Sequence, residues 1–273
     1  MSERVVQTRV GRLKVSVKGG GDHRPTALLW HSLFVDDRSW ERVTPDLERA
    51  RRLVIVTGPG HGTSGDSGRQ YSMEDCAQAA LEVLAALGVE GPVDWVGNAW
   101  GGHVGIVLAA HEPALVRTLV TAGTPVHPYP LAGRLSTQLL VVLYRRFGPT
   151  RYLTDAVVEA LLSERTRTTD PGAVDLVRDG FVTADRAGLA NAVVSISLKR
   201  RDLEPLLPEV HAPTLFITGS AHPDWSPEQM RAAAALLPRG STHVVDGAAY
   251  LVPLEAPAAF SRCVHELWAA HPA

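Results

Sequence analysis

The order in which apolar runs and helical patterns alternate along the chain most constrains its fold. Continuous apolar stretches, typical of strands buried on both faces, recur at residues 26–31, 51–58, 93–98, 116–123 and 213–220. Helical patterns separate most of them. Residues 72–88, for example, have apolar residues at helical spacing between Ser72, a candidate N-cap, and Gly88. This alternation predicts an α/β fold with a mostly parallel twisted sheet flanked by helices.

The alternation is interrupted once, between residues 126 and 205. This segment contains no convincing strand. Its helical stretches are residues 135–148, 154–165 and 186–201. We therefore expect residues 1–125 to form the first part of an α/β core, residues 126–205 an inserted helical cap, and residues 206–273 the second part of the core. Alternating residues on either side of Gly11 predict an N-terminal β-hairpin.

Composition and charge exclude several classes of function. The 273 residues carry a formal charge of −2, which gives no electrostatic reason to expect a nucleic-acid or membrane partner. The run Lys199-Arg200-Arg201 is flanked by acidic residues and is interpreted as a solvated helix end. The chain has no signal-peptide pattern, no run long enough to cross a membrane, and two cysteines far apart, Cys76 and Cys263. We expect a cytoplasmic protein, monomeric or homodimeric.

The stretch VDWVGNAWGG, residues 93–102, has the outline of a nucleophile elbow. In the pattern G-x-S-x-G, a sharp turn between a strand and a helix presents a serine to the substrate. Here Ala99 occupies the serine position, so the turn has no nucleophile. The question is whether this is a disabled hydrolase or a protein that uses the same turn for different chemistry.

Five segments together carry a family resemblance: LLWHSLFVDDRSW, VIVTGPGHGTSGD, VGNAWGGHVG, TLFITGSAHPDWSPEQM and VVDGAAYLVPLEAPAAF. In this order they resemble the oxyanion loop, the Pro-Gly-His-Gly turn, the nucleophile elbow, the acid-bearing strand and the histidine segment of capped α/β-hydrolases. The resemblance implies the α/β-hydrolase fold with a helical cap inserted into the core.

The sequence departs from the family at each catalytic position. Besides Ala99, the position of the acid falls on His222 and that of the histidine on Tyr250; Asp224 could serve as the acid only if the loop register slips. An engineered knockout needs only one change, so three departures favour a native, degenerate triad. Losing one main triad member costs roughly six orders of magnitude in kcat, which argues against covalent hydrolysis.

A nucleophile elbow without its serine still has the backbone N–H groups of the turn. The resemblance implies that the N–H groups of Trp100 and Leu33 form an oxyanion hole, which would stabilise an enolate as well as a tetrahedral intermediate. His222 and Tyr250 would be neighbours and form a candidate acid–base pair; the alternative is that both only fill space. The residues that we expect to line the pocket are Ala99, His31, Ser32, Trp30, Asn98 and Val252. Among them, His31 is interpreted as structural rather than catalytic.

The leading hypothesis is a non-hydrolytic enzyme that transfers a proton next to a substrate carbonyl, as an isomerase or epimerase in peptide or other natural-product biosynthesis. Relatives with eroded triads include a peptide epimerase that inverts an aspartate residue and can recruit the substrate's own carboxylate as base. The substrate would be a small molecule or a modified peptide, with no cofactor and no metal. One alternative is a catalytically inert ligand-binding protein, and another is an unusual or engineered-inactive ester or amide hydrolase.

Overall fold

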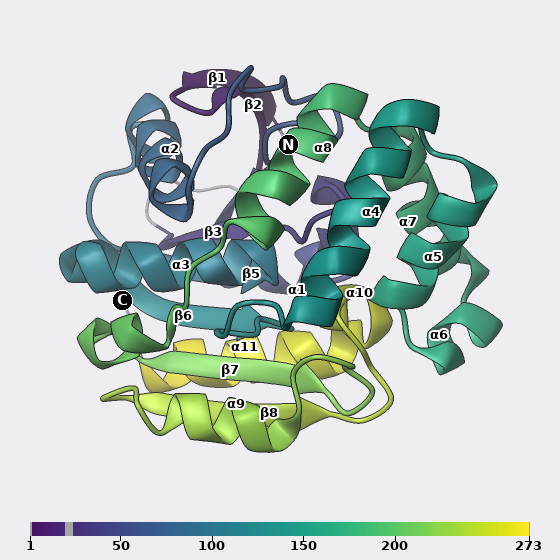
Figure 1. The fold of residues 1–273 in the computed structure, drawn as a ribbon. Helices are drawn as coiled ribbons and strands as arrows, with labels where there is room; N and C mark the ends of the chain where they lie inside the picture. Colours follow the sequence, from purple (N-terminus) through teal and green to yellow (C-terminus); the bar gives the residue numbers. More distant parts are fainter. Residues whose placement is uncertain (1, 20–23, 273) are drawn as a thin grey trace.

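A computed structural model describes residues 2–19 and 24–272, so residues 1, 20–23 and 273 of the expected core lie outside the described part. Its strands are β1 (Ser2–Thr8), β2 (Gly11–Lys18), β3 (Thr26–Trp30), β4 (Arg52–Val56), β5 (Val93–Asn98), β6 (Val116–Ala122), β7 (Thr214–Gly219) and β8 (Gly240–Val245). They form one eight-stranded sheet in the order β1-β2-β4-β3-β5-β6-β7-β8 (Figure 1). The β1–β2 and β2–β4 pairs are antiparallel and the other pairs are parallel. The expected mostly parallel α/β sheet is confirmed.

Helices cover both faces of this sheet. On one face, α2 (Met73–Ala86), α3 (Trp100–His111) and α9 (Pro227–Ala234) pack in a cluster with Trp30 and Trp95. On the other face, α1 (Thr44–Leu47) and α11 (Pro257–Ala270) bury a second cluster. The helix expected at residues 72–88 is α2, which starts at a capping box between Ser72 and Asp75.

Between β6 and β7 the chain forms α4 (Leu131–Phe147), α5 (Arg151–Leu161), α6 (Glu164–Thr169), α7 (Pro171–Thr183) and α8 (Arg186–Val193). These helices gather beside the edge where β5 passes into α3 (Figure 1). They share an apolar cluster with Ala99, at that edge, and with Tyr250, just before the short helix α10 (Val252–Glu255). The helical segment therefore covers the carboxyl ends of the central strands.

The stretch expected as one helix at residues 186–201 is divided. α8 ends at Val193, a single π-helical segment follows at Val194–Leu198, and the chain then leaves regular structure. The return to the core runs beside the outgoing chain, where the Leu203 N–H donates to the Val126 carbonyl at 3.0 Å.

No helix within residues 2–19 and 24–272 combines the length and the apolar character that a membrane crossing needs.

Candidate functional site

Ala99 lies at the corner between β5 and α3 in a rare backbone conformation, with φ 45° and ψ −99°. Two glycines make this corner possible. A Cβ on Gly97 would lie 2.2 Å from the Gly101 carbonyl carbon, and a Cβ on Gly101 would lie 1.8 Å from the Trp30 carbonyl oxygen. The corner therefore keeps the close-packed geometry of a nucleophile elbow although its central residue has only a methyl group.

Two backbone N–H groups remain available at this corner. Trp100 is the first residue of α3, so its N–H has no acceptor within the helix. Leu33 lies in the loop after β3, and both residues line the same cavity. Within the described residues neither N–H donates to a protein acceptor. The positive end of the α3 dipole adds to the favourable potential for an anion here.

Two buried histidines hold the loop that carries Leu33. His31 Nε2 accepts a hydrogen bond from the Gly58 N–H at 2.8 Å, and His61 Nε2 accepts one from the Phe34 N–H at 3.2 Å. Burial lowers the pKa of His31, and burial together with the nearby His31 ring lowers the pKa of His61 to about 3. Both rings are therefore neutral near pH 7 and act as supports, as the structural interpretation of His31 expects.

The two expected acid–base residues touch, but they do not hydrogen-bond to each other. The rings of His222 and Tyr250 lie 3.8 Å apart between centroids. The Tyr250 hydroxyl instead donates to Asp224 Oδ2 at 2.5 Å. Burial, followed by the neighbouring Tyr129 and Asp224, raises the pKa of Tyr250 far above its usual value, so the phenol stays protonated. The carboxylate of Asp224 is thus the partner of this phenol.

His222 has no free lone pair to act as a base. Its Nδ1 accepts from the Asp224 backbone N–H at 3.1 Å, so a neutral ring carries its proton on Nε2. Burial lowers the pKa of His222 to about 4. His222 Nε2 is enclosed and has no hydrogen-bond partner among the described residues. In this arrangement His222 positions the Asp224 backbone.

A cavity of about 660 Å³ lies between the core and the helical segment. Of the site residues expected from sequence, it is lined by Ser32, Leu33, Ala99, Trp100 and Tyr250. The others lie outside its lining: Trp30, His31, Asn98, His222 and Val252. Most of these are held inside the core. For example, the Asn98 side-chain amide donates to the carbonyls of Ala122 and Tyr250 and fixes the segment that carries the phenol.

Three polar residues line this cavity in addition to those expected there: Tyr129, Arg200 and Asp224. From the sequence, Tyr129 is only one of several cap residues that are candidates for the cavity wall. The sequence offers Asp224 as the acid only for a shifted loop register, and the signal for it is that Asp224 is the nearest carboxylate to the expected acid position, two residues after His222. Arg200 was expected to be solvated, yet its residue is only 8% exposed. Its neighbour Arg201 is exposed, as expected.

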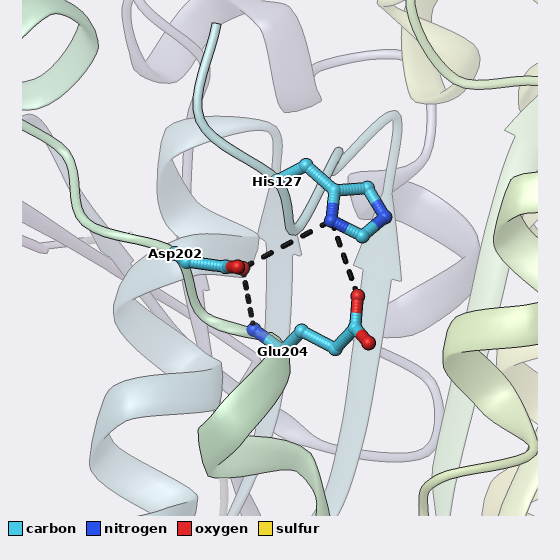
Figure 2. Close-up of side chains that lie close together, drawn as sticks. All are labelled: His127, Asp202 and Glu204. Carbon is cyan, nitrogen blue, oxygen red and sulfur yellow. Dashed lines mark hydrogen bonds and ion pairs between the residues drawn. The ribbon is translucent and has the colours of Figure 1, made fainter.

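Figure 2 shows a separate polar cluster where the chain enters and leaves the helical segment. His127 Nδ1 lies 3.2 Å from Glu204 Oε2 and 3.9 Å from Asp202 Oδ1. These three groups have the chemistry of cation ligands and are close enough to share one ion. They are partly exposed, and none of them lines the cavity. The two acidic residues are joined by a hydrogen bond from the Glu204 backbone N–H to Asp202 Oδ1, at 3.0 Å.

Three of the known proteins to which this chain is similar are described here. A hydrolase of 2-hydroxymuconate semialdehyde from Pseudomonas sp. (strain CF600) is 34% identical over 94 residues, which cover 34% of this chain and only 33% of that protein. A pimeloyl-[acyl-carrier protein] methyl ester esterase from Edwardsiella ictaluri is 26% identical over 88% of this chain and 97% of its own length. A thermophilic esterase from Thermogutta terrifontis superposes with a TM-score of 0.89 at 24% identity, over 99% of this chain and 100% of the other.

The structural similarity shows the fold, and the match to a family model shows the family. The model described as "Alpha/beta hydrolase family" matches residues 27–262, which include the elbow, the acid-bearing loop and the segment of Tyr250. This chain therefore belongs to the alpha/beta hydrolase family.

Proposed function

We propose that this protein transfers a proton at the carbon next to a substrate carbonyl, as a cofactor-independent isomerase or epimerase acting on a peptide or another natural product. One observation carries the proposal. One cavity is lined by Leu33 and Trp100, whose N–H groups have no protein acceptor among the described residues, and by Asp224, which accepts a hydrogen bond from Tyr250, whereas Ala99 supplies no nucleophile. A base and an oxyanion hole are what enolate chemistry requires.

The reaction needs three events. The substrate carbonyl oxygen accepts hydrogen bonds from the N–H groups of Leu33 and Trp100. Asp224 takes a proton from the adjacent carbon, the electron pair moves to the carbonyl oxygen as an enolate, and each backbone donor stabilises that charge by about 3 kcal/mol. For epimerisation a solvent water molecule gives a proton to the same carbon from the other face, and Asp224 releases its own proton to the resulting hydroxide. For isomerisation Asp224 returns its proton to a conjugated carbon. In both cases no atom is gained or lost and Asp224 ends as a carboxylate.

Tyr250 has a supporting part in this scheme. Its O–H bond to Asp224 holds the carboxylate in one orientation, and the high pKa of the phenol keeps its proton on the oxygen. The methyl group of Ala99 leaves space for the substrate where a serine hydroxyl would compete for the carbonyl. A substrate that carries its own carboxylate could share the work of the base.

Deuterium exchange tests the proposal. Peptides containing aspartate and other carbonyl compounds are incubated with the protein in D₂O, and deuterium at the α-carbon is measured by mass spectrometry. We expect exchange with at least one compound, and a loss of about 100-fold or more with Asp224→Asn. Glu228→Gln, which removes an exposed carboxylate on α9, is the control and should exchange at the wild-type rate. Equal rates for both variants would contradict the role of Asp224.

Hydrolysis is the second candidate, because the family and the named relatives are hydrolases. In that reaction Asp224 would take a proton from water, and the water oxygen would add to the carbonyl carbon. The tetrahedral intermediate would then expel the alcohol or amine, which takes the proton from Asp224. Isotopes separate the two reactions: hydrolysis in H₂¹⁸O places ¹⁸O in the acid product, whereas proton transfer places deuterium on the α-carbon. Tight binding of a ligand with neither label incorporated would indicate an inert binding protein.

A further inference from the structure

Arg200 places a positive charge in the wall of the cavity. It follows the π-helical segment Val194–Leu198 and lines the cavity with Ser197 and Tyr129. Its guanidinium carbon lies 5.7 Å from the centre of the Tyr129 ring. This arrangement is the reverse of the solvated helix end that the sequence predicted, because the chain turns inward after α8.

The guanidinium is bonded to neutral acceptors. Nη1 contacts the Pro125 carbonyl and His103 Nε2, and Nη2 donates to the His127 carbonyl at 2.7 Å. Burial and the nearby guanidinium lower the pKa of His103 well below its usual value, so this ring is neutral. Across the described part of the chain, no carboxylate lies within 4.0 Å of Arg200.

Part of the guanidinium fork is still free. Arginine has five N–H donors, and the Nε–H and the second Nη2–H have no partner among residues 2–19 and 24–272. Nε is not fully enclosed by protein atoms, and Arg200 is one of the residues that line the cavity. A charge removed from water without an ionic partner is unfavourable, and an anion in the cavity would supply that partner.

We propose that Arg200 anchors a carboxylate of the substrate, so that the protein acts on an apolar carbonyl compound bearing one carboxylate. A carboxylate matches the planar fork of a guanidinium. A single negative charge suits the cavity because it contains one buried arginine, and the carboxylate of Asp224 in the same cavity would repel a dianion. Apolar side chains of α4 and α5, including Leu140, Leu143 and Val157, would enclose the rest of the molecule.

The identity of this ligand as the reactant rests on the proposed function, but its binding does not. The anchor would hold one end of the substrate while the elbow N–H groups hold the carbonyl. Tyr129, which contacts the guanidinium and lies beside Tyr250, would separate the anchored carboxylate from Asp224. The substrate would thus have one orientation in the cavity.

A binding comparison tests the anchor without any turnover. ω-Phenylalkanoates with two to six chain carbons are titrated into the protein by calorimetry, each beside its neutral amide. We expect at least one acid to bind at least tenfold more tightly than its amide, since hydrogen bonds between charged groups are the stronger ones. No saturable binding of any acid up to 10 mM, or equal affinity for acid and amide, would overturn the proposal.

Variants locate the effect at Arg200. Arg200→Gln should remove the preference for the acid, and Arg200→Lys should reduce it because a point charge replaces the fork. The matched control is Arg201→Gln, which removes the same charge from the exposed neighbour and should keep the wild-type preference. If Arg200→Gln does not fold, the ratio of acid affinity to amide affinity, compared between the wild type and Arg200→Lys, still tests whether Arg200 binds the carboxylate. If acids bind selectively but no deuterium exchange occurs, carboxylate binding by Arg200 is supported and the proposed function is rejected.

Discussion

Ala99 keeps the backbone of a nucleophile elbow although its methyl group cannot attack a carbonyl. A positive φ is unfavourable for alanine, and such strain persists only where the surroundings impose it. Here the close packing at Gly97 and Gly101 imposes it, and the same corner places Trp100 in the lining of the cavity. The strained residue therefore lies directly before the residue whose N–H has no acceptor within α3.

Ala99→Gly should stabilise the protein. Relief of strain of about 1–3 kcal/mol outweighs the entropy cost of glycine, about 0.5–1 kcal/mol. We expect an increase in the free energy of unfolding, measured by urea denaturation. The comparison is Ala132→Gly on an exposed position of α4, which should lower it by about 1 kcal/mol. A loss of stability in both variants would show that Ala99 is not strained.

Ala99→Ser alone should not hydrolyse p-nitrophenyl acetate. The new hydroxyl would have no imidazole to take its proton, because Tyr250 occupies the histidine position and His222 Nδ1 accepts from the Asp224 N–H. In Ala99→Ser/Tyr250→His a histidine would stand beside Asp224, as the phenol now does. We expect a burst of p-nitrophenol only from the double variant. Comparable hydrolysis by the single variant would mean that another base acts here.

The site was partly predictable from these residues. The resemblance to α/β-hydrolases places Ala99, Trp100, Leu33 and Tyr250 at one site, and all four line the cavity. Asp224 was not chosen because the position of the acid depends on how the loop after β7 bends. Arg200 was missed because its acceptors, Pro125 and His127, lie about 75 residues away in the sequence, beyond the reach of local pattern.

At the scale of elements, the corner between β5 and α3 depends on how closely α3 approaches β3. The Gly101 N–H donates to the His31 carbonyl at 3.2 Å, and the Gly101 carbonyl accepts from Trp95 Nε1 at 2.8 Å. The backbone of α3 thus touches the backbone at the carboxyl end of β3, with no side chain between them. This contact fixes where the helix begins.

Gly101→Ala should therefore destabilise the protein by about 3 kcal/mol, because its Cβ would overlap the Trp30 carbonyl and neither backbone can move far. Gly133→Ala is the matched control. It lies in α4, where the nearest atom to an added Cβ is 3.6 Å away, so alanine should stabilise it by up to about 1 kcal/mol. Thermal unfolding of both variants checks the contrast. Equal effects would contradict the close approach.

The strands and main helices could be predicted because buried strands and amphipathic helices have distinct periodicities. The division after α8 could not, since Val194–Leu198 continues the helical pattern of residues in sequence while its backbone changes to a π-helix. Such a segment is a common device at functional sites. Here it ends two residues before Arg200, which lines the cavity.

At the scale of the whole molecule, stability should decrease on acidification. Four buried histidines have lowered pKa values: His31, His61, His103 and His222. Between the usual pKa near 6.5 and the folded values, the unfolded chain binds more protons than the folded protein. The free energy of unfolding is thus greatest above pH 6.5 and falls as the pH drops towards 4.

His222 alone accounts for about 3 kcal/mol of this loss, from its shift to a pKa of about 4. Urea denaturation at pH 7 and pH 4.5 measures the loss. His61→Gln should make it smaller, because glutamine does not titrate and its carbonyl can accept from the Phe34 N–H. The exposed His211→Gln is the control and should leave the slope unchanged. An identical slope in both variants would contradict the contribution of His61.

The hydrogen bond between Leu203 and Val126 has a consequence for how such a chain can diversify. The chain leaving β6 and the chain returning towards β7 meet at this bond, whose N–O distance is 3.0 Å. A replacement helical segment would need ends that meet at the same place and an apolar face that packs against Ala99 and Tyr250. Within those two conditions, sequence changes between residues 126 and 203 can alter the lining of the cavity while the strand register and the corner between β5 and α3 stay as they are.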